Sequence, residues 1–462
     1  MSFSQGTRAL FAVAVAAAVA GCHNTNELFC SGHPQDPSCF VAPPIDAPPD
    51  AIDAMVGCSS SAQCAAPTPV CDLPSRDCVQ CSAAEPAACV GVTPVCGPAS
   101  ACEACQAHAD CASGACLPDG SCGDDATVAY VDPAGTDNLT CTKLMPCTKV
   151  SAALATNRAY LKFHGTTDEA VLVNGGRKVT FLADADAKLT RSVGNGAIVT
   201  AQDSGTSLSI FDLSISNAPN NPSGVGLVIP PASGAPVLSL SRARVSNNPG
   251  GGISVGGGVV LVSQSVLSNN TGVAITASGG SVTVIRSSVA QNTGGGILVN
   301  SPGVFAIVGN TFFGNGTSGG TTGGITILTT QSATNKLEFN SFGKNLTQDG
   351  IGSAIQCTAG AFTARNNIMS GNGTQTNQEQ VGGSCAHAYS IALPGTLPAG
   401  GTNLAQDPLF KNTTTGDLHI LVGSPAIRAA SPDSELSGFA AADIDGDPRV
   451  APADVGADQL AR

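Results

Sequence analysis

Charged and amide-bearing side chains recur at one position of a repeated eight-residue phrase. The clearest copy is "SQSVLSNN" (263–270). Six residues before the end of four successive copies stand Asp212, Arg242, Gln264 and Arg286, with Arg244 close by. Stacked arginines can hold a uronate or a sulfate through paired hydrogen bonds, which would make this column a ligand-binding site. The alternative, which we favour, is a solvated corner in which an Asp212–Arg242 pair contributes little to stability.

A second charged group comprises Lys336, Glu338, Lys344 and Arg365, and the same two interpretations apply to it. Between 246 and 334, by contrast, Arg286 is the single charged residue and there is no carboxylate. Hydrolysis of a glycosidic bond needs a pair of carboxyl groups. Calcium-dependent elimination needs several aspartates and a basic residue. The sequence therefore argues against an ordinary polysaccharide hydrolase or lyase.

The aspartates near the C-terminus have the spacing of a calcium-binding loop. Asp443, Asp445 and Asp447 alternate, and Asp454 completes a twelve-residue stretch. Such a loop needs glycine at its sixth position, where this chain has Pro448, so we expect a capping turn instead. The six histidines include no pair four residues apart, which disfavours a histidine-based metal site. We expect no metal and no cofactor.

Cysteines are unusually numerous, at 19 in 462 residues, which indicates an oxidising compartment. Twelve of them form three groups of four: Cys58, Cys64, Cys71 and Cys78; Cys81, Cys89, Cys96 and Cys102; Cys105, Cys111, Cys116 and Cys122. So short a stretch has too few apolar side chains for a core, so covalent links must stabilise it. Zinc is the alternative, but His108 is the one histidine here. We therefore predict disulfides and leave their pairing open.

Of the seven cysteines outside these three groups, six can pair and one is left unpaired. Their order suggests three local bridges, Cys30–Cys39, Cys141–Cys147 and Cys357–Cys385, which leaves Cys22 unpaired. Cys22 follows an apolar run at 9–20 that is too short to span a bilayer and is typical of a secretory signal. Small residues directly before this cysteine resemble a bacterial lipobox, which implies that Cys22 is lipidated. A plain cleavage site with a chance cysteine is the alternative.

The repeated phrase returns at intervals of 22, 22, 23, 30 and 27 residues. Two of its positions are apolar throughout, three and eight residues before its end, and should point inward. The first column is Ile215, Val245, Leu267, Val289, Phe312, Phe342 and Met369, and the second is Ile210, Leu240, Val262, Val284, Ile307, Leu337 and Ala364. Between them stand small polar residues that mark a bend, and short strands follow Gly-rich turns. A period near 22 built from short strands predicts an all-β solenoid.

This pattern resembles the right-handed, single-stranded parallel β-helix of pectate-lyase-like proteins. In that family, asparagines at an inward bend stack their amides into a ladder. The resemblance implies that Asn310, Asn340 and Asn367 form one, with Ser265 and Ser287 as smaller members. The segment "YVDPAGTDNLTCTKLMPCTKVSAALA" (130–155) resembles the entry to such a helix. The stretch "DIDGDPRVAPADVGADQ" (443–459) resembles the closing segment of bacterial β-helix surface proteins.

The resulting organisation has five parts: 1–21, a lipoprotein signal peptide; 22–57, a Pro/Asp/Ala-rich tether; 58–122, cysteine-rich repeats; 127–395, the β-helix; 396–462, its closing segment. A net charge of −13 makes a nucleic-acid partner unexpected. We expect a non-catalytic lipoprotein on the outer membrane or cell surface of a Gram-negative bacterium, with a β-helix that binds glycans or other envelope molecules. A polysaccharide lyase or hydrolase with an atypical site, and a structural or adhesive envelope component, are the alternatives.

Overall fold

The computed structural model describes most of the chain from Gly57 to Leu460. The gaps are 221–223, 232–233, 301–303, 329–331, 333, 351, 359–361, 375, 396 and 398–400. The predicted signal peptide and lipidation site and the proposed Cys30–Cys39 bridge lie outside the described residues. The chain divides into two compact units, of which the first ends at Cys78 and the second begins at Val79.

The cysteine-rich region is disulfide-bonded, as predicted. In each group of four, the first cysteine pairs with the third and the second with the fourth: Cys58–Cys71, Cys64–Cys78, Cys81–Cys96, Cys89–Cys102, Cys105–Cys116 and Cys111–Cys122. Short elements lie between them: η2 (Ser61–Gln63), β1 (Val70–Asp72), β2 (Asp77–Val79), η3 (Pro86–Ala88), β3 (Val95–Cys96), β4 (Cys102–Glu103) and η4 (His108–Asp110). Interlocked pairs of this kind compensate for a core that so short a segment cannot build.

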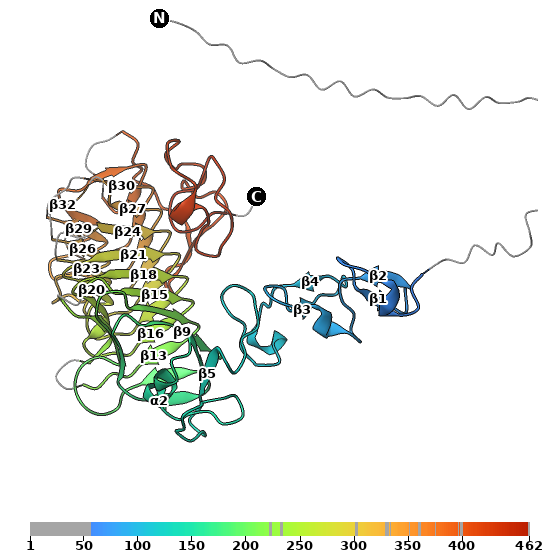
Figure 1. Cartoon of the computed structure of the whole chain (residues 1–462). Helices are drawn as coiled ribbons and strands as arrows, with labels where there is room; N and C mark the ends of the chain where they lie inside the picture. Colours follow the sequence, from blue (N-terminus) through green and yellow to red (C-terminus); the bar gives the residue numbers. More distant parts are fainter. Residues whose placement is uncertain are drawn as a thin grey trace, which may run out of the picture. The chain divides into compact units, whose positions relative to one another are not determined.

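Three parallel sheets of 11, 10 and 9 strands form the walls of a β-helix (Figure 1). The first sheet contains β5 (Val128–Val131), β6 (Tyr160–Phe163), β9 (Lys178–Ala183), β12 (Ser207–Phe211), β15 (Val237–Ser241), β18 (Val259–Ser263), β21 (Ser281–Ile285), β24 (Val304–Val308), β27 (Lys336–Glu338), β30 (Thr363–Arg365) and β33 (Ala386–Ala388). The second contains β7 (Thr166–Asp168), β10 (Lys188–Thr190), β13 (Ser214–Ser216), β16 (Arg244–Ser246), β19 (Val266–Ser268), β22 (Ser288–Ala290), β25 (Thr311–Phe313), β28 (Ser341–Gly343), β31 (Ile368–Ser370) and β34 (Ile391–Leu393). The third contains β8 (Val171–Val173), β11 (Val199–Ala201), β14 (Val225–Ile229), β17 (Gly251–Val255), β20 (Ile275–Ala277), β23 (Ile297–Val299), β26 (Ile325–Ile327), β29 (Ile355–Cys357) and β32 (Val381–Gly383).

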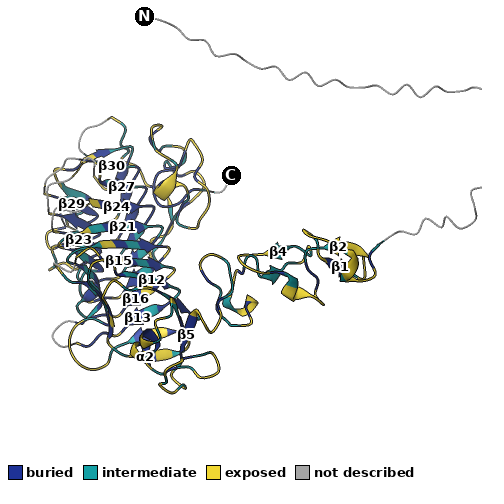
Figure 2. Ribbon diagram, in the orientation of Figure 1, coloured by how far each residue is buried: buried dark blue, intermediate teal, exposed yellow. Residues whose placement is uncertain are grey.

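The core runs through the middle of the three sheets, because side chains on a strand alternate between its two faces. Both predicted apolar columns are fully buried, which confirms the predicted register. Leu267 pairs in register with Val289, and Val289 pairs with Phe312. Phe312 stacks on Phe342 with the ring centroids 4.7 Å apart. Figure 2 shows buried positions along the strands and exposed positions on the connecting loops.

The predicted asparagine ladder is present at the bend between the first and second sheets. The Asn310 amide donates to Oδ1 of Asn340 at 3.0 Å, and Asn340 donates likewise to Asn367 at 3.0 Å. Ser265 and Ser287 extend it, since the backbone N–H of Ser265 donates to Oγ of Ser287 at 3.1 Å. The ladder satisfies backbone groups that would otherwise be buried without a partner.

A second ladder, which the sequence reasoning missed, lies at the bend that follows the second sheet. It is formed by the last residue of six of the seven copies of the phrase: Asn248, Asn270, Asn292, Asn315, Asn345 and Asn372. All six are fully buried, and neighbouring amides lie 2.7–3.1 Å apart. The repeated phrase therefore marks two bends of each coil rather than one.

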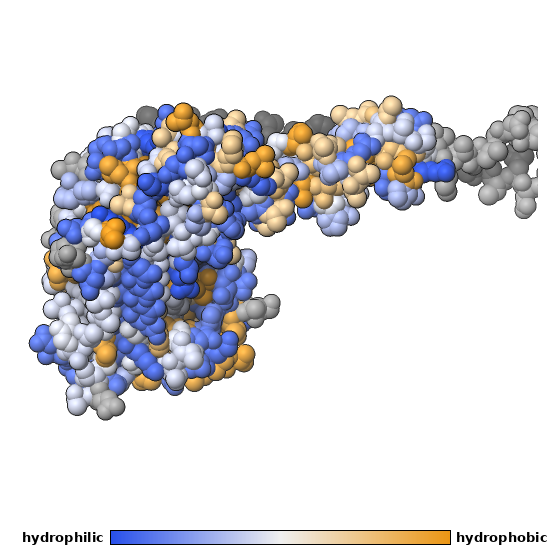
Figure 3. Space-filling view, turned by 90° about the horizontal axis from the view of Figure 1, so that it is seen from below, coloured by the Kyte–Doolittle hydropathy of each residue, from blue (hydrophilic) through white to orange (hydrophobic). Residues whose placement is uncertain are grey.

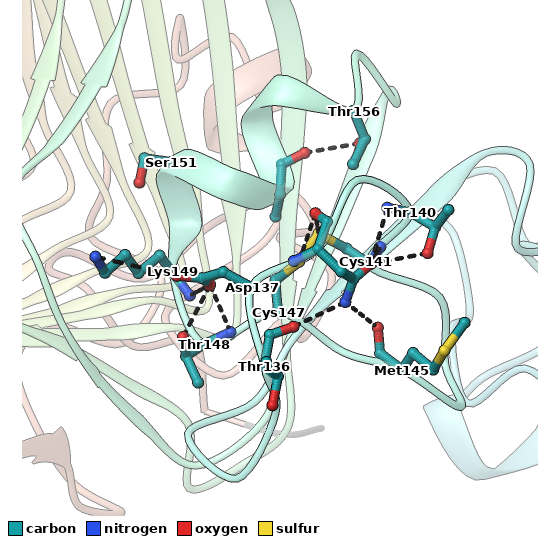
Figure 4. Close-up of a disulfide and its surroundings, with 12 residues drawn as sticks. Thr136, Asp137, Thr140, Cys141, Met145, Cys147, Thr148, Lys149, Ser151 and Thr156 are labelled. Carbon is teal, nitrogen blue, oxygen red and sulfur yellow. Dashed lines mark hydrogen bonds and ion pairs between the residues drawn. A yellow bond between two sulfur atoms is a disulfide. The ribbon is translucent and has the colours of Figure 1, made fainter.

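The entry segment closes the N-terminal end of the β-helix. Cys141 and Cys147 are disulfide-bonded, and Asp137 organises the turn by accepting hydrogen bonds from Thr148 and Lys149 (Figure 4). The short helix α2 (Val150–Ala155) follows, and the Glu169 carboxylate accepts the N–H of Val150 at 2.6 Å. Among the described residues, no helix has the length and apolarity needed to cross a membrane.

The closing segment lies along the flank of the coils, where Figure 1 shows it beside β24 and β27. It contains β35 (Phe410–Asn412), β36 (Asp417–Ile420) and η5 (Gly438–Ala440). Its apolar residues, among them Ile420 and Val455, pack against Phe339 and Ile368 of the coils. The buried Arg449 guanidinium lies 4.5 Å from the centre of the Phe339 ring. This packing brings the closing segment against the coils, where Glu435 forms an ion pair with Lys336.

Candidate functional site

The predicted charged column is a column of bend residues. Asp212, Arg242, Gln264 and Arg286 have φ values of 63°, 53°, 48° and 46°, so each sits in the left-handed region at the corner after a strand of the first sheet. The turn needs this backbone conformation whatever the side chain is. Arg244 lies apart from the column, on the second sheet, in register with Ser214 and Val266.

Within the column, Arg242 is already paired. Its Nε donates to Oδ1 of Asp212 at 2.7 Å and its Nη2 donates to Oδ2 at 2.8 Å. The guanidinium also lies 5.7 Å from the centre of the Phe211 ring. The side chain of Arg242 remains about half exposed, at 54%, so the pair adds little to folding stability. Its fixed geometry presents both hydrogen-bond donors and acceptors beside an aromatic ring.

This pair lines a cleft of about 630 Å³, here named the junction cleft. One wall is the third cysteine-rich group, and the other is the corner of the β-helix. Its lining residues are Ala104, Cys105, Gln106, Ala107, His108, Cys116, Leu117, Pro118, Asp119, Gly120, Leu182, Ala183, Ala185, Phe211, Asp212 and Arg242. Leu117 packs against Leu182, and the Tyr130 hydroxyl donates to the carbonyl of Ser113 at 3.1 Å. These contacts hold the two walls together, so the cleft is preformed.

A second hollow of about 380 Å³, here named the lysine pocket, shares His108 with the junction cleft. Lys162 and Asp184 form a hydrogen-bonded ion pair in it, and Nδ1 of His164 lies 3.0 Å from Oδ2 of Asp184. Burial lowers the pKa of Lys162, although Asp184 opposes this. Burial alone would raise the pKa of Asp184, but the hydrogen bonds from Lys162 and His164 lower it overall.

His108 lines both hollows. Its Nδ1 accepts the backbone N–H of Cys116 at 3.1 Å. Burial lowers the pKa of His108, and the positive charge of Lys162 lowers it further. Sequence reasoning missed the lysine pocket because none of its residues belongs to the repeated phrase. The available signal was the spacing of 22 residues between Lys162 and Asp184, which is one coil.

The second charged group is only partly brought together. Glu338 and Arg365 are in register on neighbouring strands, and Lys336 forms an ion pair at 2.9 Å with Glu435 of the closing segment. Burial raises the pKa of Glu338, against the effect of Lys336 and Arg365. Lys344 lies at the other bend, where its Nζ is 5.9 Å from the centre of the Phe313 ring.

The aspartates of 443–454 behave as the predicted capping turn. Oδ1 of Asp443 accepts the backbone N–H groups of Asp445, Gly446 and Asp447 at 3.0, 3.0 and 2.8 Å. Oδ1 of Asp454 accepts the N–H of Arg428 at 2.8 Å. Both carboxylates are fully buried and hold backbone in place. In this turn both carboxylates therefore serve as acceptors for backbone N–H groups.

The surface in Figure 3 is mostly hydrophilic, and its hydrophobic positions are scattered rather than gathered into one broad patch. The outer face of the first sheet carries hydroxyl groups, for example Ser209 and Ser239, whose oxygens lie 2.9 Å apart.

A family model matches the middle of the chain. Residues 193–391 match the family model described as "Right handed beta helix region". A similar solved structure is that of pectate lyase Pel9A, with 14% identity and a TM-score of 0.41 over 72% of this chain and 96% of that chain. No curated protein matches the sequence. The sheet topology and the family model together bear out the predicted right-handed parallel β-helix.

Proposed function

We propose that the chain is a non-catalytic surface lipoprotein and that its junction cleft binds a carbohydrate. The observation that carries this proposal is the arrangement of Phe211, Arg242 and Asp212 at the wall of a preformed cleft. An aromatic ring offers an apolar face to a sugar, while the ion pair offers donors and acceptors to its hydroxyl groups. Small-molecule sites commonly combine such surfaces in one concave pocket.

The geometry favours a neutral glycan over an acidic one. Two of the guanidinium hydrogen-bonding groups of Arg242 are already used by Asp212, so its charge is compensated. A uronate or sulfate that bound the remaining N–H groups of Arg242 would lie close to the Asp212 carboxylate, which would repel it. Sugar hydroxyls can instead donate to the carboxylate and accept from the remaining N–H groups without breaking the pair.

The test is glycan-array screening of the full chain, followed by calorimetry with the best neutral oligosaccharide. We expect Phe211→Ala and Arg242→Ala to weaken binding at least tenfold while the melting temperature stays within a few degrees. Arg286→Ala is the matched control, because it changes the same bend position outside the cleft. Loss of binding in Arg286→Ala would indicate that the column, and not the cleft, is the site. Failure to bind any glycan would reject the proposal.

One observation favours polysaccharide cleavage as a second candidate function. Lys162, whose pKa burial lowers, lies beside His164 and Asp184 in a pocket that adjoins the cleft, and such groups can transfer protons. Release of reducing or unsaturated sugar ends from polysaccharides, abolished by Lys162→Met, would support it. Product release that Lys162→Met leaves unchanged would exclude this pocket as its source.

A further inference from the structure

Three potential metal ligands converge within the closing segment. They are His419 in β36, Asp445 in the turn after η5, and Asp458 close to the C-terminus. One ligand atom from each lies within 4.8 Å of the others. They lie 26 and 13 residues apart in the sequence, so no local motif contains all three.

Hydrogen bonds fix each of the three residues. Oδ2 of Asp458 accepts the backbone N–H of Ile420 at 2.9 Å, which ties the C-terminal stretch to β36. The N–H of Asp445 donates to the buried Asp443 at 3.0 Å. Nδ1 of His419 is hydrogen-bonded to Asp417, which leaves Nε2 directed at Asp445, 2.9 Å away. The cluster is therefore held in place before any ligand arrives.

The Asp417–His419 contact is the arrangement that metal-binding histidines use. A carboxylate on one ring nitrogen orients the imidazole and makes the other nitrogen a better ligand. The surrounding charge also favours a cation, since Asp417, Asp445 and Asp458 all face His419. Lys411 forms an ion pair at 3.1 Å with Asp417, and among the described residues no lysine or arginine lies within salt-bridge distance of Asp445 or Asp458.

We propose that Nε2 of His419 and the carboxylates of Asp445 and Asp458 bind a divalent transition-metal ion such as zinc. One imidazole and two carboxylates match zinc, whereas calcium prefers oxygen ligands alone. Asp417 is a positioning residue that holds the imidazole. The ion would join the β35–β36 hairpin, the 443–447 turn and the C-terminal stretch. It would also keep a coordination position open. The proposal is independent of carbohydrate binding in the junction cleft.

The test is calorimetric titration of zinc into the EDTA-treated full chain, with the melting temperature recorded in parallel. We expect one tightly bound zinc per chain and a rise in melting temperature. His419→Gln and Asp445→Asn should each lower zinc affinity about a hundredfold, and Asp417→Asn about tenfold. Asp447→Asn is the matched control, because this exposed aspartate of the same turn is outside the cluster.

Several results would overturn the assignment. Equal zinc affinity in His419→Gln and in the unchanged chain would show that zinc binds elsewhere. An equal loss of affinity in Asp447→Asn would indicate diffuse attraction by the acidic turn. Calcium binding as tight as zinc binding would show an oxygen-ligand site instead. The metal-free His419→Gln variant could have a lower melting temperature than the unchanged chain. In that case the zinc affinity of Asp445→Asn tests the site, since Asp445 is 57% exposed and its replacement should leave the fold intact.

Discussion

The side-chain amide of Asn270 donates to Oδ1 of Asn292, 2.8 Å away and one coil further along the β-helix. The backbone N–H of Asn270 donates to the same oxygen at 3.1 Å. Asn292 in turn donates to Asn315 at 2.9 Å and to the carbonyl of Leu267 at 3.0 Å. Each asparagine therefore binds the coils on both sides of it, and the bend depends on an unbroken series.

Replacing Asn292 by alanine should lower the free energy of unfolding by about 2–4 kcal/mol, because it leaves buried groups of both neighbouring coils without partners. Urea denaturation measures this change. Gln291→Asn is the control, since Gln291 is exposed and its φ of 56° suits asparagine. Comparable losses in both variants would contradict a ladder role for Asn292.

Val289 and Ser288 test the register of the same coil. Val289 is fully buried between Leu267 and Phe312, so Val289→Asp should cost several kcal/mol and lower the melting temperature sharply. Ser288 points to the opposite face and is only partly buried, so Ser288→Asp should shift the melting temperature by about a degree or two. Thermal denaturation of both variants checks the difference, and equal tolerance would be incompatible with the observed core.

His387 should make stability depend on pH. Burial lowers its pKa from 6.5 to about 4, so the folded chain stays unprotonated at this position while the unfolded chain takes up a proton. The contribution of neutral His387 to the free energy of unfolding is therefore fully present above pH 6.5. As the pH falls towards 4, the free energy of unfolding decreases by up to about 3 kcal/mol. Urea denaturation at pH 7 and pH 5 measures it, and His387→Leu should flatten the slope.

His164 provides the control for this experiment, because its pKa is shifted the other way. The hydrogen bond to Asp184 raises it, so its contribution is present below pH 6.5 and is lost as the pH rises through the folded value. His164→Gln should therefore remove a slope of opposite sign. If His387→Leu leaves the difference between pH 7 and pH 5 unchanged, the pH dependence arises from other groups.

Cys22 remains a prediction, since it lies outside the described residues. Cys22→Ala should move the protein from the membrane fraction to the soluble fraction and abolish labelling with radioactive palmitate. Both effects follow if acyl chains on this cysteine provide the anchor. Sedimentation of the variant with membranes would show that lipidation of Cys22 is not the means of attachment.

The sequence by itself determined the solenoid, its inward-facing columns and the first ladder. These features could be predicted because each coil repeats the same local requirements, namely strand alternation and a polar residue at an inward bend. Val289 and Asn310 can be assigned from their columns without knowledge of any contact. The second ladder was within reach of the same reasoning, since asparagine ends six of the seven copies of the phrase and an asparagine column of this kind also indicates an inward bend.

Only the tertiary structure decided the candidate sites. Asp212 and Arg242 were aligned by the repeat, but the cleft around them exists because the third cysteine-rich group packs on Leu182 and Phe211. The pairing of Cys105 with Cys116, and the approach of His419 to Asp445 and Asp458, likewise depend on how segments outside the repeat fold back. A periodic pattern specifies contacts between equivalent positions of neighbouring coils. Contacts between non-equivalent segments depend on packing, which the spacing of a sequence repeat does not specify.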